Sequence, residues 1–175
     1  RNYTTKNSQL SNDLVICFTE KDSKIWAGTD GGGVNIIDPE DNSIKVLSHV
    51  SGDPSSFPAH SIKTIYTDNY GNIWAGSTRN GLIKVSQSGM KTYTDSHIGL
   101  PSGLSNPSAL CLFQEDDEDE IWIGTDGGGI NRFVPKSNTF THYPNTFRTK
   151  IISIASYSDT ELALSAYADK IWLFN

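Results

Sequence analysis

The polar side chains best suited to contact a small ligand fall between short apolar segments of the chain. Imidazole, guanidinium and carboxylate groups exchange hydrogen bonds with polar molecules, and binding residues concentrate on loops that a rigid scaffold holds in place. The predicted ligand-binding residues are His49, His60, Arg79, His97 and Arg148, with Asp30 and Asp126 as further candidates. For each of them the alternative is a solvated loop side chain that binds nothing.

Two other groups of residues have the chemistry of metal ligands. Six acids in a row occupy residues 115–120, and carboxylates are the ligands that Ca²⁺ prefers. No spaced Asp-x-Asp-x-Asp-Gly loop accompanies them, so a solvated turn is favoured. Cys17 and Cys111 lack metal-ligand spacing and lie in apolar runs, which predicts buried free thiols. We therefore expect no metal and no cofactor.

Charge and composition argue against several classes of function. The net charge is −6 and no basic stripe is present, so nucleic acid is not an expected partner. The longest apolar runs are about five residues, too short to cross a membrane. Acid–base catalysis needs converging titratable groups, and Asp68 has no visible catalytic partner. An enzyme is therefore not expected.

A repeated unit must position these residues. The motif Ile-Trp-x-Gly begins at residues 25, 73 and 121, a spacing of 48 both times. A fourth copy, residues 162–174, keeps the hydrophobic positions but has Ser165 in place of the glycine. The conserved pair in the three full copies is Trp26 with Gly28, Trp74 with Gly76, and Trp122 with Gly124. Internal repeats of this length are typical of repeat architectures.

Each copy predicts four short strands joined by turns of Gly, Asn, Asp and Pro. Four antiparallel strands in about 40–50 residues are typical of a β-propeller blade; a solenoid or sandwich is the alternative. The Ile-Trp pair makes both faces of the second strand apolar, as in a blade between two neighbours. The tryptophans are therefore expected to be buried, and the glycines to allow close approach of a neighbour. The predicted fold is all-β: a single partial propeller over residues 1–175, with blades at 14–47, 62–93, 109–143 and 151–175.

The glycine-rich turns after the second strands do not have the context of a phosphate loop. They lie between two strands, with no following helix and no Lys-Ser/Thr pair. They are better explained as hairpin turns that need residues with positive φ.

These motifs resemble the two-component regulator propeller repeat. The resemblance rests on Ile-Trp-x-Gly-Thr-Asp-Gly-Gly, on Asp-Asn-Tyr-Gly-Asn-Ile-Trp at 68–74, and on Phe-Thr-His-Tyr at 140–143. It covers nearly the whole chain, although the third copy has the acidic run in place of the Asp-x-x-Gly turn.

The resemblance implies a segment of the periplasmic sensor region of a Bacteroides-type hybrid two-component sensor. It implies an oligosaccharide ligand, signalling to glycan-use genes, and partners in the rest of the parent sensor; Phe57 or Phe147 would supply an aromatic platform. The alternative is a propeller scaffold for protein–protein interaction without a small-molecule ligand.

The two ends of the chain raise the question of how the propeller closes. The chain begins at Arg1, and we expect it to be a piece of a longer protein. Residues 1–5 align with the fourth strand of a blade, whereas the fourth copy ends after its third strand. Residues 1–5 could therefore complete that blade within the chain and close a small ring. We expect instead an open arc that associates with a second copy, because a free strand edge tends to pair.

Overall fold

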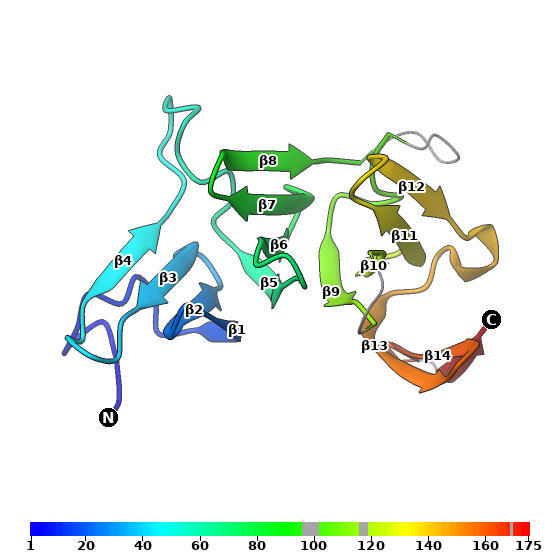
Figure 1. The fold of residues 1–175 in the computed structure, drawn as a ribbon, viewed down its shortest axis with the longest axis horizontal. Helices are drawn as coiled ribbons and strands as arrows, with labels where there is room; N and C mark the ends of the chain where they lie inside the picture. Colours follow the sequence, from blue (N-terminus) through cyan, green and yellow to red (C-terminus); the bar gives the residue numbers. More distant parts are fainter. Residues whose placement is uncertain (96–101, 116–118, 169) are drawn as a thin grey trace.

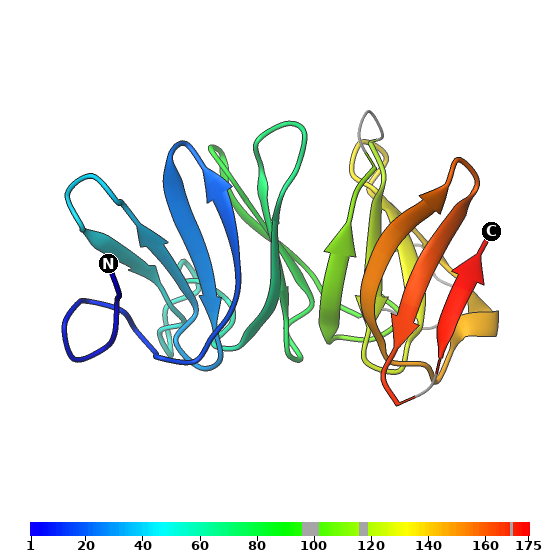
Figure 2. The same cartoon turned by 90° about the horizontal axis from the view of Figure 1, so that it is seen from below.

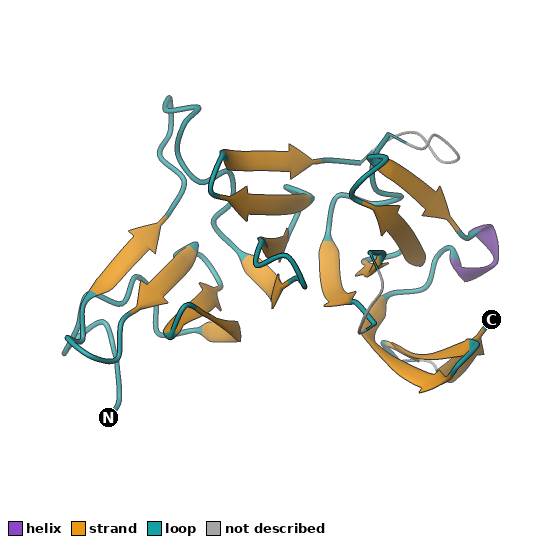
Figure 3. Cartoon of the chain, viewed as in Figure 1, coloured by secondary structure: helices purple, strands orange, loops and turns teal. Residues whose placement is uncertain are grey.

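The structure, a computed structural model, describes residues 1–95, 102–115, 119–168 and 170–175. Their short β-branched and aromatic segments form four antiparallel sheets, and the predicted all-β propeller fold is confirmed (Figures 1 and 3). The only helical turn within the described residues is the 3₁₀ turn η1 (Pro144–Thr146). None of the described residues belongs to a helix long and apolar enough to cross a membrane.

Three sheets have four strands and the fourth has three, each in chain order. Blade 1 consists of β1 (Val15–Lys21), β2 (Lys24–Thr29), β3 (Val34–Ile37) and β4 (Ile44–Leu47). Blade 2 consists of β5 (Ile62–Thr67), β6 (Ile73–Ser77), β7 (Leu82–Ser86) and β8 (Gly89–Tyr93). Blade 3 consists of β9 (Ala109–Phe113), β10 (Ile121–Thr125), β11 (Ile130–Val134) and β12 (Thr139–His142). Blade 4 consists of β13 (Ile151–Ser158), β14 (Glu161–Ala166) and β15 (Ile171–Phe174).

The blades form an open arc around a common centre (Figure 1). The first strands β1, β5, β9 and β13 lie on the concave side and contact one another in sequence, and the outer strands β4, β8 and β12 lie on the convex side. Figure 2 shows the sheets standing beside one another. One rim of the arc therefore carries the turns from first to second strand, and the other carries the loops between blades.

Residues 1–5 do not form the outer strand that their alignment predicts. They have no strand pairing and lie against blade 1, where Tyr3 packs beside the cluster of Leu10, Ala27, Ile37 and Ile44. The Tyr3 hydroxyl donates to Asn42 Oδ1 at 3.0 Å. Phe174, at the other end, packs on Trp122 and Tyr143. The chain therefore does not close on itself, and blade 4 keeps three strands.

The repeated glycines admit the next blade, as the sequence predicts. A Cβ atom on Gly28 would lie 2.6 Å from Ile62 Cγ2, and one on Gly124 would lie 2.7 Å from Ile151 Cγ2. A Cβ on Gly76 would lie 2.8 Å from the carbonyl oxygen of Ala109. Ile62, Ala109 and Ile151 each begin the first strand of the following blade, so glycine sets how closely two blades approach.

The prediction that all three repeat tryptophans are almost fully buried is correct only for Trp74. Its ring is 0% exposed, and Phe133 lies over it at 5.6 Å between ring centroids. Trp26 and Trp122 are half-buried. Each packs on the following blade, but in blade 2 the smaller Val85 occupies the position of Phe133, and blade 4 has no outer strand to cover Trp122.

Candidate functional site

The candidate site is the rim formed by the loops between blades, called here the loop rim. Each glycine-rich turn between the second and third strands is tied to the loop that leads into the next blade. In blade 1, the amides of Gly31 and Gly33 donate to the carbonyl oxygen of His60 at 3.1 and 2.7 Å. The equivalent bonds in blades 2 and 3 run from Gly81 to Pro107 and from Gly129 to Thr149. The rim is therefore a rigid backbone framework.

Two buried asparagines reinforce this framework, and the sequence analysis missed them. The Asn35 side chain accepts from the amide of Ser11 at 2.9 Å and donates to its hydroxyl at 2.8 Å. Asn131 makes the same pair of bonds with Ser105, at 2.9 and 2.8 Å. Both asparagines are 0% exposed. The signal was present as Leu-Ser-Asn at 10–12 and again at 104–106.

Blade 2 replaces this polar clamp with apolar contacts. By strand register Ile83 occupies the position of the two asparagines, and Pro58 precedes the first strand by the same distance as Ser11 and Ser105. Ile83 is fully buried in a cluster with Phe57 and Ala59. Phe57 is 2% exposed, so its proposed use as an aromatic platform for a ligand is wrong: its ring is part of the core.

Two of the predicted ligand-binding residues lie together on the loop rim. The rings of His49 and His60 meet edge to face, with centroids 5.0 Å apart. Both side chains are exposed, while the backbone of His60 is held by the glycine turn of blade 1. The pair thus offers imidazole groups from a fixed position.

The two arginines stand further along the same rim. Arg79 lies in the glycine turn of blade 2 and Arg148 in the loop before blade 4; both are exposed and have positive φ, 69° and 66°. The Arg79 amide donates to Ser108 Oγ at 3.2 Å, and the Arg148 amide donates to the carbonyl oxygen of Gly127 at 2.9 Å. Their backbones are hydrogen-bonded to neighbouring loops, and both residues are accessible to solvent. His97 lies outside the described residues.

The two aspartates of the rim are already paired. Asp30 Oδ2 lies 3.1 Å from Lys63 Nζ, and Asp126 Oδ1 lies 2.9 Å from Lys150 Nζ. Hydrogen bonds from Ser61 and Lys63 hold the pKa of Asp30 below its usual value. Both carboxylates offer oxygen acceptors suited to polar contacts.

The opposite rim carries a polar cavity that the sequence analysis did not predict. Its volume is about 490 Å³, and it is lined by Lys21, Asp22, Tyr70, Gly71, Asn72, Ser86, Gln87 and Ser88. Tyr70 is 65% exposed and donates to Asp119, which also pairs with Lys136. The bond to Asp119 raises the pKa of Tyr70.

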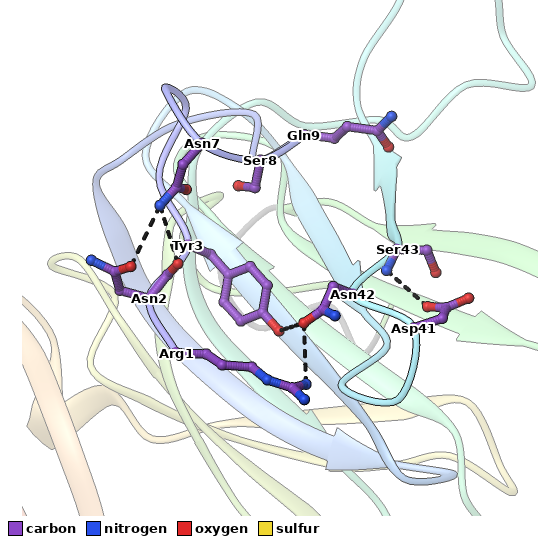
Figure 4. Close-up of a pocket in the computed structure, with 9 residues that line it drawn as sticks. All are labelled: Arg1, Asn2, Tyr3, Asn7, Ser8, Gln9, Asp41, Asn42 and Ser43. Carbon is purple, nitrogen blue, oxygen red and sulfur yellow. Dashed lines mark hydrogen bonds between the residues drawn. The ribbon is translucent and has the colours of Figure 1, made fainter.

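A second polar cavity, of about 600 Å³, lies between the N-terminal segment and the turn at Asp41–Ser43 (Figure 4). Its side chains largely bond one another: Arg1 and Tyr3 both donate to Asn42 Oδ1, at 3.1 and 3.0 Å. Asn7 donates to the backbone and side chain of Asn2. Four of the predicted ligand-binding residues, all among those that the structure describes, are absent from the lining of both cavities: His49, His60, Arg79 and Arg148.

The acidic run and the cysteines behave as ordinary structural groups. Glu120 pairs with Arg132 at 3.2 Å, and Glu115 accepts from Ser156 at 3.1 Å; residues 116–118 lie outside the described part. Burial raises the pKa of the Cys17 thiol to about 11 and that of Cys111 to about 12, so both are protonated near neutral pH. Within the described residues, no three His, Cys, Asp or Glu side chains gather as metal ligands.

Comparison with protein families confirms the resemblance read from the motifs. The two component regulator propeller family model matches residues 56–79. This segment runs from the loop before blade 2 through the Asp-x-x-Gly turn and the Ile-Trp-x-Gly strand. A comparison with curated proteins found no match.

Solved structures with the same fold include extracellular domains of two-component systems. The extracellular domain of the putative hybrid two component system BT3049 from B. thetaiotaomicron superposes with a TM-score of 0.80 at 24% identity, over 100% of this chain and 23% of that one. The equivalent domain of BT4673 from the same organism gives 0.76 at 16%, over 93% and 21%. A streptogramin B lyase gives 0.65 at 16%, over 95% and 56%. The chain thus spans less than a quarter of the two extracellular domains.

Proposed function

We propose that this chain is a segment of the ligand-sensing propeller of a hybrid two-component sensor, on the periplasmic side of the inner membrane. The observation that carries the proposal is the match of residues 56–79 to the two component regulator propeller family model. The full-length superposition on an extracellular sensor domain supports it. The parent reading frame tests the assignment: it should encode a membrane helix, a histidine kinase and a receiver, and a frame without them would contradict it.

We propose an oligosaccharide as the ligand and the loop rim as its contact surface. The exposed His49 and His60 rings, with Arg79 and Arg148, supply hydrogen-bond donors on fixed backbones, and His97 belongs to the same predicted set. The paired Asp30 and Asp126 supply acceptors. A ligand with many hydroxyl groups matches such a mixed set of donors and acceptors.

Calorimetric titration with a panel of neutral oligosaccharides tests this surface. Binding by the isolated chain is expected to be weak, because the chain holds part of the sensor. The double variant His60→Ala/Arg79→Ala should weaken binding about thirtyfold, since each of the two lost hydrogen bonds contributes about 1 kcal/mol. Tyr70→Ala, on the opposite rim, is the matched control and should bind normally. If Tyr70→Ala lost binding and the double variant did not, the ligand would not bind at the loop rim.

No catalytic role is proposed for this segment. Asp30 and Asp126 on the loop rim are paired with lysines, and the sequence offers no pair of converging acids. Incubation with the same oligosaccharides should leave them intact. Turnover that disappears when one acidic residue is replaced would contradict this.

A scaffold for protein partners is the second candidate function. It is favoured by exposed apolar side chains at both ends of the arc, where Phe18 in blade 1 and Ile171 in blade 4 are each 75% exposed. The titration separates the two functions, because a scaffold would bind none of the saccharides while keeping its fold.

A further inference from the structure

Within the arc, successive blades meet through the same contact. The second strand of one blade presents its tryptophan to an apolar recess on the next blade. For Trp74 the recess in blade 3 consists of Leu104, Ala109, Ile121, Ile123 and Phe133. All five side chains are fully buried, so this contact excludes water.

Blade 1 carries the same recess on the face that no blade covers. Strand register places Ile25 and Ile37 where blade 3 has Ile121 and Phe133. It places Val15 opposite Thr29 as Ala109 lies opposite Thr125. Together with Leu10, Ala27 and Phe18 these residues form what we call the Trp socket. They line an apolar cavity of about 300 Å³, bordered by residues 1–3.

Half of the Trp socket is exposed where its counterpart is closed, while Leu10, Ala27 and Ile37 are buried beside Tyr3. Val15 is 43% exposed, Phe18 75% and Ile25 36%, whereas Ala109 and Ile121 are each 0% exposed. Contiguous exposed apolar surface of this kind marks an interaction site. The three contacts inside the arc show what covers such a surface: a tryptophan followed two residues later by glycine.

The other end of the arc does not provide that partner. Ala163 pairs with Ala155 and Leu173 as Trp26 pairs with Thr19 and Ile36. Blade 4 therefore has alanine where the other blades present tryptophan.

The glycine is also missing from blade 4. Ser165 pairs with Ser153 and Ile171 at the position of Gly28, Gly76 and Gly124, whose missing Cβ lets the next blade approach. A second copy of this chain thus lacks both the side chain that would fill the socket and the gap that admits the next blade.

We propose that the Trp socket binds a further blade of the same repeat type, one that brings a Trp-x-Gly strand, and not blade 4 of a second copy. This proposal replaces the expectation, drawn from the sequence, that the open arc associates with a second copy of the chain. The proposal rests on the proposed function in one respect: the further blade would come from the rest of the parent propeller. The side chains themselves require only that the incoming strand carry the tryptophan and the glycine.

Restoring the missing pair in blade 4 tests the proposal. The variant Ala163→Trp/Ser165→Gly gives blade 4 both features, and the mass in solution is measured by sedimentation velocity. The wild-type chain should remain a monomer of 19.2 kDa. The double variant should associate head to tail at least about tenfold more tightly, because a tryptophan buried at an interface is commonly a dominant contact.

A third variant locates the contact. Adding Phe18→Asp to the double variant should return it to a monomer, because a carboxylate would be buried in the socket without a partner. Circular dichroism checks that each variant keeps the β fold, and Phe18→Asp in the wild-type background checks that this change alone is tolerated.

Three outcomes would overturn the proposal. Wild-type chains that associate as tightly as the double variant would make a second copy the occupant. A folded double variant that stays monomeric would show that the socket does not accept a Trp-x-Gly strand. Association that survives Phe18→Asp would place the contact elsewhere.

Discussion

Two regions of the arc are built on the same repeat: the contact between blades 2 and 3, and the outward face of blade 4. The first excludes water, whereas the second is exposed to solvent. In the first, Trp74 is fully buried and its indole N–H donates to Asp68 Oδ2 at 2.7 Å. In the second, Ala163 and Ser165 occupy the tryptophan and glycine positions, and Leu173 is 53% exposed. The second and third strands pair in the same register in blades 2 and 4. The two faces therefore differ at the tryptophan and glycine positions of the second strand.

The largest expected effect comes from removing Trp74. Trp74→Ala should lower the free energy of unfolding by about 3–5 kcal/mol, because it opens a cavity between two blades and leaves the buried Asp68 without its indole donor. Trp26→Ala, in the half-exposed position, should cost about 1–3 kcal/mol. Urea unfolding measures both free energies. Equal losses of stability would show that Trp74 and Trp26 make equivalent contacts, and would contradict the expected difference between them.

Substitution at the glycine position should destabilise the chain more in blade 2 than on the open face of blade 4. Gly76→Ala places a Cβ 2.8 Å from a backbone oxygen of blade 3 and should cost about 1–3 kcal/mol through overpacking. Ser165→Gly, on the open face, should cost about 1 kcal/mol or less, from chain entropy alone. Urea unfolding of both variants is the measurement, and a neutral Gly76→Ala would mean that the blades can move apart freely.

The pairing of the buried Asn131 with Ser105 distinguishes blade 3 from blade 2, which has Ile83 and Pro58 at these positions. Asn131→Ala should cost about 1–3 kcal/mol, because the amide of Ser105 loses its buried acceptor. Ile83→Asn should destabilise blade 2 by a similar amount, because Pro58 offers no matching amide N–H or hydroxyl. Thermal unfolding of each variant checks the pair. If Ile83→Asn stabilised the chain, an asparagine at this position would not need the Ser partner that blade 3 provides, which would contradict this explanation.

Much of the arc could be predicted from the sequence. The spacing of 48 between Ile-Trp-x-Gly motifs fixes the blades, and the glycines follow from the need for close approach. The unequal burial of the tryptophans could not be predicted from the motif, because it depends on Phe133, Val85 and the missing outer strand of blade 4. The course of residues 1–5 could not be predicted either, because Tyr3 packs on side chains of blade 1 that no local pattern connects to it.

The candidate site was predicted in part. The exposure of His49, His60, Arg79 and Arg148 on one rim follows from their loop positions. The close approach of the two imidazole rings joins residues 11 positions apart through the loop's fold, which no local pattern encodes. Phe57 was misassigned because a loop aromatic and a core aromatic that precedes a strand look alike in sequence.

The smallest expected effect is the pH dependence contributed by the thiols. Burial raises the pKa of Cys17 to about 11 and of Cys111 to about 12, above the ordinary value of 9.0. The folded chain therefore holds these protons more tightly than the unfolded chain, so their contribution is complete below pH 9 and is lost as the pH rises towards 11 and 12. Unfolding of the wild type and of Cys17→Ala/Cys111→Ala at several pH values measures it. If the free energy of unfolding fell equally with rising pH in both proteins, the thiols would contribute nothing to the pH dependence.

The exposed face of blade 1 requires that the arc is open, with its two end faces apart. Spin labels at positions 2 and 175, with both native cysteines replaced by alanine, report the distance between the two ends of the chain by double electron–electron resonance. The open arc predicts a single long distance that is independent of protein concentration. A closed ring would place residues 1–5 beside β15, about 5 Å away between paired strands. A short distance in a monomeric sample would therefore contradict the open arc and the exposed Trp socket with it.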